Sequence, residues 1–324
     1  MTIKIFPDRI QIGNFNLFEG NGGLQFDGEA RAENFQEINS PHYGTVAGFV
    51  LGGYGGGGFE RTINRFAFSS EVPVSTTPNA LSFAKGVNAG LSSETEGYAY
   101  RGANSNPPDA PLYPRIERHP FAAPYPFTVV GTATTPVNQT SWSTSEKGFV
   151  TSPSGFETFA FSSSSTSATP SGTLGPGGIP QSSCVGGQSS GTHGYATGVY
   201  IGNPIYKFPF AVPITAVDVG DLTQGRSNPA ATSSPTYGYS SGGYAVPNVN
   251  TIDKFPFAAE TNASDVGDLN SPMNITCGWS SQTHGYQMGQ LSVSAFSKWP
   301  FATDTNATDL TGSVQRQTTR GSTD

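Results

Sequence analysis

Three groups of residues have the side-chain types and spacing that chemistry requires. His193 and His284 each precede a Gly-Tyr pair, and histidine is a frequent metal ligand. Two aspartate pairs supply the oxygen ligands that Ca²⁺ takes; they are Asp218 with Asp221 and Asp265 with Asp268. Cations recur at one position of a repeated segment, where they could bind an anion or an acidic sugar; they are Arg65, Arg118, Lys207, Lys254 and Lys298.

A structural role is the favoured interpretation of each group. The slot of His193 and His284 holds Tyr237, Glu96 and Lys147 in other copies of the repeat, which is typical of a strand start and not of a metal shell. His119 takes the phenylalanine position of its copy, so we expect it to pack.

Acidic and basic residues follow the same logic. The aspartate pairs are absent from most copies of the repeat, so turn capping or pairing with a lysine is expected, and Ca²⁺ binding is the weaker alternative. Each recurring cation is expected to pair with an acidic neighbour in its own blade and to lay its stem over the sheet. We predict no catalytic residue, no cofactor and no metal, with the four aspartates as weak calcium candidates.

Signals for catalysis are sparse. No Gly-x-Ser-x-Gly elbow occurs. The 23 acidic residues are scattered along the chain and leave a glycosidase-type carboxylate pair open. The two cysteines, Cys184 and Cys277, fall in the third and fifth repeats and are expected to be free thiols, because a disulfide needs Cα atoms within about 7 Å.

The elements that would position these residues come from a repeat of about 47 residues. A glycine followed by an aromatic residue recurs six times, and a strand-like block ending in phenylalanine lies downstream of each copy. The aromatic residue after the glycine is Phe49, Tyr98, Phe149, Tyr195, Tyr239 or Tyr286. The last phenylalanine of the block is Phe68, Phe121, Phe161, Phe210, Phe257 or Phe301.

The block alternates with a period of two, as a strand does. Phe255 and Phe257 share one face, and Ile252 and Lys254 share the other. Burying one Phe contributes roughly 1.5–3 kcal/mol, so these rings should be the main packing element between neighbouring sheets. We predict an all-β fold, a six-bladed propeller over residues 39–324. Its repeats span about 39–93, 94–145, 146–190, 191–235, 236–282 and 283–324.

Residues 1–38 do not match the repeat. Ile3–Phe6 and Arg9–Ile12 alternate as short strands, Leu24–Phe26 alternates again, and Gly28–Phe35 is expected to be a helical turn or a linker. This segment is predicted to be a small β module or arm that serves for attachment.

Composition narrows the class of protein. Only 12% of the residues are charged, while 41 Gly, 25 Pro and 38 aromatic residues indicate an ordered, turn-rich β protein. The net charge is −7 without a Lys/Arg cluster, so a nucleic-acid partner is not expected. No run of 18 apolar residues and no charged-then-apolar start occur, so neither a membrane span nor a secretory signal is expected.

The order of elements resembles the kelch-type propeller repeat. In the fifth repeat a strand ends in Gly242-Gly243, a variable loop follows, and Ile252–Phe257 has the apolar-acidic-x-aromatic order, before a polar turn and a return strand at Ser264–Leu269. The resemblance covers residues 39–324. It departs in that only the first and fifth repeats keep both glycines and that the Phe-Pro-Phe block replaces the family's later tryptophan.

The amino-acid sequence of the repeats also resembles that of virion structural proteins of tailed marine cyanophages. Thr192–Tyr195, Lys254–Ala258 and Asp265–Leu269 carry this likeness, and Arg9–Gly13 and Gly23–Gly28 resemble the start of such proteins. The resemblance implies a virion protein assembled in the host cytoplasm, a homo-oligomer in the particle that is bound to other virion proteins through residues 1–38. The loops 69–93, 101–115 and 162–183 would be its contact surfaces, with host glycans as candidate partners.

Two alternatives stay open. One is a glycan-binding, lectin-like propeller, and the other is a propeller enzyme that acts on surface polysaccharide. Whichever applies, a propeller must be sealed. The segment after Arg316 falls where other repeats lead into the next Gly-aromatic strand, so we expect it to complete the first repeat's sheet, with Asn39–Tyr43 as the competing donor.

Overall fold

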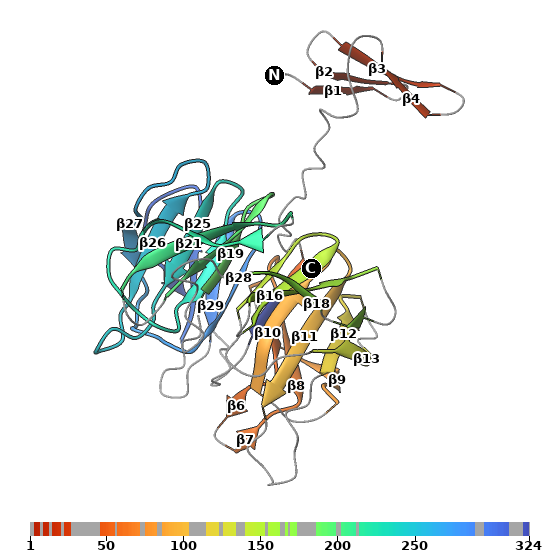
Figure 1. Ribbon diagram of the computed structural model, residues 1–324. Helices are drawn as coiled ribbons and strands as arrows, with labels where there is room; N and C mark the ends of the chain where they lie inside the picture. Colours follow the sequence, from red (N-terminus) through yellow and green to blue (C-terminus); the bar gives the residue numbers. More distant parts are fainter. Residues whose placement is uncertain are drawn as a thin grey trace. The chain divides into compact units, whose positions relative to one another are not determined.

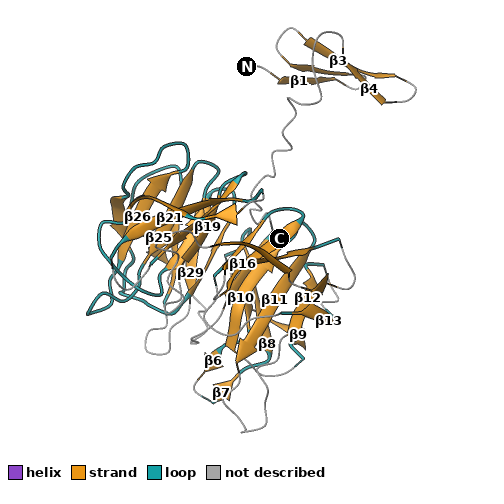
Figure 2. Ribbon diagram, viewed as in Figure 1, coloured by secondary structure: helices purple, strands orange, loops and turns teal. Residues whose placement is uncertain are grey.

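The chain divides into two compact units in the computed structural model, Met1–Ile38 and Asn39–Asp324. The structure describes residues 3–6, 9–12, 15–20, 23–26, 46–55, 57–71, 75–82, 86–103, 115–122, 126–133, 140–152, 155–162, 166–167, 169–173, 186–198, 202–211, 214–288, 295–310 and 320–323. Within these ranges every regular element is a strand, and no helix is long and apolar enough to cross a membrane (Figure 2).

The first unit contains an antiparallel sheet in the order β1-β2-β3-β4 (Figure 1). The strands are β1 (Ile3–Phe6), β2 (Arg9–Ile12), β3 (Phe15–Gly20) and β4 (Gly23–Phe26). The predicted strands at Ile3–Phe6 and Arg9–Ile12 are confirmed, and Ile3 pairs with Ile12. Gly28–Phe35 lies outside the described residues.

The second unit is all-β and has a β-propeller arrangement, which confirms the predicted fold class at that level. Five of its sheets are blades whose four main antiparallel strands follow one another along the chain. We name each sheet after the repeat that contributes its second strand.

Each blade takes its first strand from the end of the preceding predicted repeat. The second-repeat blade holds β10 (Gly86–Ser92), β11 (Glu96–Ala103), β12 (Arg115–Pro120) and β13 (Thr128–Thr132). The third holds β14 (Ser141–Ser143), β15 (Lys147–Ser152), β16 (Gly155–Ala160) and β18 (Thr169–Thr173).

The fourth-repeat blade holds β19 (Gly186–Ser189), β20 (His193–Thr197), β21 (Pro204–Pro209) and β23 (Val217–Asp221). The fifth holds β24 (Ala230–Ser233), β25 (Tyr237–Ser241), β26 (Thr251–Pro256) and β27 (Ser264–Asp268). The sixth holds β28 (Cys277–Ser280), β29 (His284–Met288), β30 (Phe296–Pro300) and β31 (Thr308–Asp309).

The first-repeat sheet differs because its strands come from distant parts of the sequence. It has the order β32-β5-β8-β9, with β5 (Ala47–Leu51), β8 (Thr62–Ala67), β9 (Ser75–Ala80) and β32 (Arg320–Thr323). Gly321 pairs with Val50 and Thr323 with Gly48. The prediction that the segment after Arg316 completes this sheet is confirmed; the competing donor Asn39–Tyr43 lies outside the described residues.

The first strands of neighbouring sheets contact one another in a closed circle. Strand β32 contacts β10, β10 contacts β14, and β14 contacts β19. Strand β19 then contacts β24, β24 contacts β28, and β28 contacts β32. The sheet faces between them bury the hydrophobic core in separate clusters, one at each interface. The fold is therefore held by contacts between adjacent sheets and not by one central core.

The outer edges of several sheets are covered by the next repeat. Two short strands, β17 (Thr166–Ser167) and β22 (Ile214–Thr215), pair in parallel with β13 and β18. In the fourth and fifth blades the Ala263 and Ala307 amides donate to the carbonyls of Asp221 and Asp268, each 2.8 Å away. Covering an open edge in this way protects a sheet from pairing with other chains.

A small extra hairpin interrupts the first repeat. It consists of β6 (Tyr54–Gly55) and β7 (Gly58–Phe59), and the two aromatic rings meet edge to face at 5.3 Å. Tyr54 is 41% exposed.

Candidate functional site

The twelve recurring aromatic residues meet in pairs across the sheet interfaces. Tyr195 stacks on Phe257 of the next repeat, with ring centroids 4.8 Å apart and planes inclined by 26°. The same pairing occurs in Phe49–Phe121 (5.3 Å), Tyr98–Phe161 (4.5 Å), Phe149–Phe210 (4.8 Å), Tyr239–Phe301 (4.9 Å) and Tyr286–Phe68 (5.1 Å). The predicted packing role of these residues is therefore confirmed, and the aromatic residue after each glycine meets the last phenylalanine of the following repeat's block.

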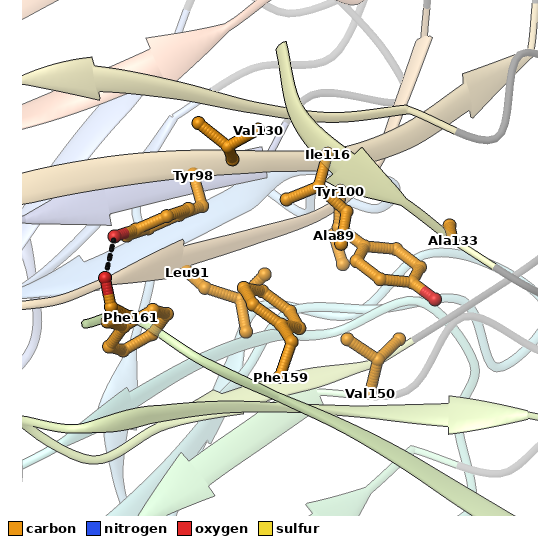
Figure 3. Close-up of a cluster of buried hydrophobic side chains, with 10 residues drawn as sticks. All are labelled: Ala89, Leu91, Tyr98, Tyr100, Ile116, Val130, Ala133, Val150, Phe159 and Phe161. Atoms are coloured by element: carbon orange, nitrogen blue, oxygen red, sulfur yellow. Dashed lines mark hydrogen bonds between the residues drawn. The ribbon is translucent and has the colours of Figure 1, made fainter. Parts of the chain in front are cut away.

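The interface between the second and third repeats shows the arrangement in detail. Tyr98 lies over Phe161, and Leu91 and Phe159 fill the space beside them (Figure 3). The Tyr98 hydroxyl donates to the Phe161 carbonyl at 3.5 Å, and Tyr195 donates to the Phe257 carbonyl at 3.2 Å. Burial raises the pKa of Tyr195 to about 12, so the phenol keeps its proton and remains a donor.

The glycine before each aromatic residue makes room for a second ring. A Cβ on Gly194 would lie 2.2 Å from the Phe208 ring, and a Cβ on Gly238 would lie 2.3 Å from the Phe255 ring. Each of these phenylalanines is the first of the two in the Phe-Pro-Phe segment on the neighbouring strand. The glycine of the pair thus leaves room for a phenylalanine ring of its own sheet, such as Phe208, and the aromatic residue of the pair packs against the next sheet.

His193 and His284 lie at the starts of β20 and β29, as predicted. Each Nδ1 lies 2.8 Å from the hydroxyl of the preceding threonine, Thr192 or Thr283. Partial burial lowers the pKa of His193, Lys207 lowers it further and Glu260 opposes the shift. Among the described residues no group of three His, Cys, Asp or Glu side chains is placed to hold a metal ion.

His119 is a buried member of the aromatic core. Its ring lies 5.0 Å from Phe127 and 5.2 Å from Phe49, and its Nδ1 donates to the Pro120 carbonyl at 3.2 Å. Burial lowers the pKa of His119 to about 4. The expectation that this histidine packs in place of phenylalanine is confirmed.

The aspartate pairs sit at bulged turns of the outer strands. Asp218 accepts a hydrogen bond from the Gly220 amide at 3.3 Å, and Asp265 accepts one from the Gly267 amide at 3.1 Å. The amide of Asp221 donates to the Asn262 side chain of the next repeat, and that of Asp268 donates to Asn306, both at 3.0 Å. The first aspartate of each pair caps a turn, as predicted, and the second ties its strand to the following sheet.

The recurring lysines correct one prediction. Lys207 pairs with Glu260 at 3.1 Å, Lys254 with Asp304 at 2.8 Å, and Lys298 with Glu71. Each acid belongs to the next repeat and not to the lysine's own blade. The expectation of a partner within the repeat holds for Arg118, which pairs with Glu96 at 3.3 Å.

The reason lies in the turn after the last phenylalanine. The acid follows this phenylalanine by three residues in the first, fifth and sixth repeats. Because the phenylalanine faces the preceding sheet, the turn brings the acid beside the lysine of that sheet. Sequence proximity alone could not indicate this pairing.

Buried charges at the interfaces were missed by the sequence interpretation. The side chains of Arg226 and Asp253 form a fully buried ion pair between the fourth and fifth repeats. Asp253 also accepts hydrogen bonds from the Thr223 amide at 3.0 Å and the Thr223 hydroxyl at 2.7 Å. Burial lowers the pKa of Arg226, and Asp253 opposes that shift.

Two further buried acids occupy the strand position of Asp253 in other repeats. Glu157 accepts a hydrogen bond from the Tyr100 hydroxyl at 2.5 Å, and Glu117 accepts one from the Ser82 amide at 2.8 Å. Both donors belong to the preceding repeat. The acidic position of the repeat carried the signal, but only the fold shows that it faces the neighbouring sheet.

The first strands carry a second pattern that sequence inspection missed. In each first strand a residue with a side-chain hydroxyl is the ladder partner of the glycine of the Gly-aromatic pair. A small residue lies two positions before it. The small residues are Gly90, Ser141, Gly187, Ala231, Gly278 and Gly321, and the hydroxyl residues are Ser92, Ser143, Ser189, Ser233, Ser280 and Thr323.

Both positions serve contacts between adjacent first strands. A Cβ on Gly278 would lie 2.7 Å from the Ala231 carbonyl oxygen, and one on Gly187 would lie 2.6 Å from that of Ser141. The Ser233 hydroxyl accepts a hydrogen bond from the Ser189 amide at 3.0 Å. The strands approach closely, and the hydroxyl residues satisfy amides at their edges.

The predicted contact loops are partly strands. The segment 69–93 contains β9 and β10, and the segment 162–183 contains β17 and β18, so these parts belong to sheets and the loop interpretation was wrong for them. Residues 104–114 lie outside the described residues. The described large apolar side chains that are most exposed are Val246 (67%), Val217 (52%) and Val46 (51%).

Cys277 is buried, and its Sγ lies 3.4 Å from the Met288 carbonyl oxygen, while Cys184 lies outside the described residues. No protein-family model matches the chain, and no curated protein matches it. The aspartate pairs and the lysines Lys207 and Lys254 take part in turns and in contacts between sheets.

Proposed function

We propose that the chain is a non-enzymatic structural protein of a phage virion, namely a fibre, an appendage or a surface decoration. In this proposal the second unit is a six-bladed, kelch-like propeller, the first unit attaches the protein to other virion proteins, and several copies assemble in the particle. The protein is assembled in the host cytoplasm and carried in the virion.

The six-bladed count is supported by the circle of first strands. Counting the first-repeat sheet as a blade gives every stack of recurring aromatic residues an interface of its own, including Tyr286–Phe68 between the last and first repeats. The kelch-like type is supported by the glycine pairs. Gly52-Gly53 and Gly242-Gly243 share nearly the same positive φ values, 54° and 110° against 61° and 110°.

The structural, non-enzymatic role is supported by the way buried titratable side chains take part in packing, and this observation carries that part of the proposal. His119 packs between aromatic rings, Asp253 is paired with Arg226, and Glu157 accepts the hydrogen bond of Tyr100. Each of these groups holds two adjacent sheets together. Side chains committed to packing in this way are not free to bind or activate a substrate.

The phage assignment rests on the resemblance of the repeats to cyanophage virion proteins. Thr192–Tyr195 and Lys254–Ala258, which carry the resemblance, lie in or beside the strands that pack the sheets together. The recurring sequence segments therefore coincide with the strands that pack the sheets together, which suits a protein selected for a durable shape. Host glycans would meet loops such as the one around Val246.

Mass spectrometry of purified particles tests the proposal. We expect peptides of this chain in virions of the phage that encodes it, with an antibody label at a defined place on the particle. Peptides confined to the lysate and missing from the particle would overturn the assignment.

The two alternatives have their own tests with the purified full chain. Saturable binding to several equivalent sites on a glycan array would favour the lectin-like function. Release of sugars from cyanobacterial surface polysaccharide would favour the enzyme. The virion proposal predicts no sugar release.

A further inference from the structure

The closing strand β32 is connected differently from every other first strand in the described part of the propeller. Each of the others is followed along the chain by the second strand of its own sheet, whereas β32 reaches β5 from the far end of the repeat array. Its covalent link to the sixth-repeat blade passes through nine residues, 311–319. Nine residues span at most about 30 Å, which is enough for a strand to reach a neighbouring molecule.

The edge that β32 covers demands a partner. In β5 the side chains of Ala47, Phe49, Val50 and Leu51 are fully buried, so the strand cannot turn away into solvent. Four residues of β32 pair with it in an antiparallel ladder, from Arg320 with Leu51 to Thr323 with Gly48. Without β32, this edge would expose unpaired backbone groups beside an apolar strand, which favours pairing with another chain.

The junction between the last and first repeats is also held by contacts that do not involve β32. Phe66 meets Phe296 edge to face at 4.5 Å, and Phe68 stacks on Tyr286 at 5.1 Å. Lys298 pairs with Glu71 across the same junction. The acceptor edge can therefore keep its shape while the strand that fills it is exchanged.

The acceptor edge also selects the strand that it takes. At the position of Gly321 the other described first strands carry only Gly, Ala or Ser, and at Gly187 and Gly278 even a Cβ would lie within 2.7 Å of a neighbouring carbonyl oxygen. At the position of Thr323 they carry serine, and three of these serines accept a hydrogen bond from the amide of an adjacent strand. Residues 320–323, Arg-Gly-Ser-Thr, satisfy both requirements.

We propose that the edge of β5 is a strand-acceptor site at which a second copy of this chain donates residues 320–323. Two copies that exchange these strands remake the same ladder and form no new interface, which is the low-cost route to a dimer known as domain swapping. Each donated strand remains covalently attached to its own propeller, so the exchange links the two copies. This proposal does not depend on the proposed place in a virion.

The test uses the full chain and a labelled peptide of residues 314–324 as probe. The protein is unfolded and refolded with excess peptide, and the retained label is measured after gel filtration. We expect at least tenfold more label with the native peptide than with the matched Gly321→Val peptide. Equal retention of the two peptides, or none of either, would overturn the acceptor site.

A second measurement tests exchange between copies. Two batches of full chain with different fluorophores are refolded together at high and low concentration and analysed by light scattering and energy transfer. We expect a mixed dimer at high concentration that the Gly321→Val chain forms at least tenfold less. A monomer at all concentrations, or a dimer that the variant forms equally well, would refute the exchange.

Discussion

Tyr286 of the sixth repeat stacks on Phe68 of the first, with ring centroids 5.1 Å apart and planes inclined by 26°. These two residues are the most distant in sequence of the paired aromatic residues, yet their geometry matches that of Tyr195 and Phe257 in adjacent repeats. The same packing rule therefore applies where the chain meets itself and where it simply continues.

Removing one ring of this pair should destabilise the propeller. We expect Phe68→Ala to lower the free energy of unfolding by about 2–4 kcal/mol, from lost burial and the lost ring contact. Tyr286→Phe keeps the stack and should cost less than about 1 kcal/mol. Urea denaturation of both variants measures the difference; equal costs would contradict the role of the stack.

The glycine of the Gly-aromatic pair should resist even a methyl group. Gly238→Ala places a Cβ against the Phe255 ring at 2.3 Å, and we expect a loss of about 1–3 kcal/mol from overpacking. Gly57→Ala is the matched control, because a Cβ there meets no atom within 4 Å. If thermal melts of the two variants coincide, the seat formed by Gly238 is not required.

His119 should make stability depend on pH. Burial lowers its pKa to about 4, below the usual 6.5, so the folded state holds the neutral form and the unfolded state takes up the proton first. The contribution of neutral, buried His119 to the free energy of unfolding is complete above pH 6.5 and declines as the pH falls towards 4. Its size is about 3 kcal/mol, at 1.36 kcal/mol for each unit of pKa.

The variant His119→Phe isolates this effect, because other groups also titrate in that range. It restores the phenylalanine of the repeat and removes the proton-binding group. We expect the free energy of unfolding to fall by about 3 kcal/mol less between pH 7 and pH 4 in the variant than in the native protein. Identical pH profiles would show that His119 is not buried in its neutral form.

The buried and exposed ion pairs should differ in their contributions. Arg226→Met leaves Asp253 buried without its charge partner, and we expect a loss of about 3–5 kcal/mol. Asp304→Asn breaks the more exposed pair with Lys254 and should cost less than about 1 kcal/mol. Chemical denaturation of both variants tests this order, and a larger loss for Asp304→Asn would reverse the interpretation.

Loss of the closing strand should weaken the whole propeller. Deletion of residues 317–324 removes β32 and its ladder to β5, which costs about 4 kcal/mol at roughly 1 kcal/mol for each hydrogen bond. The melting temperature should fall by about 5–10 °C. Deletion of residues 1–38, which form a separate compact unit, is the control and should leave the melting temperature of the second unit unchanged.

Local patterns predicted most of the strands and the packing residues. Alternation over Ile252–Phe257 predicted β26, and the recurrence of the Gly-aromatic pair and of the downstream phenylalanine block identified the two members of each ring pair. This succeeds because a strand's period of two determines which side chains share a face, and the repeat applies one solution to every interface. The substitution of His119 for phenylalanine was interpreted correctly for the same reason.

Partners across interfaces could not be predicted in this way. Lys207 was expected to pair within its own blade, yet its acid is Glu260 of the next repeat. The small residues of the first strands, such as Gly278, could not be predicted either, because the group that leaves no room for a side chain there is a carbonyl of another sheet.

The sequence alone therefore determined the repeat, the strand pattern and the aromatic faces, since these depend on residues a few positions apart. The tertiary structure decided which sheet each face meets and where Arg226 and Asp253 are buried together. Those outcomes depend on contacts between residues far apart in the chain, which exist only after the sheets have packed around a common axis.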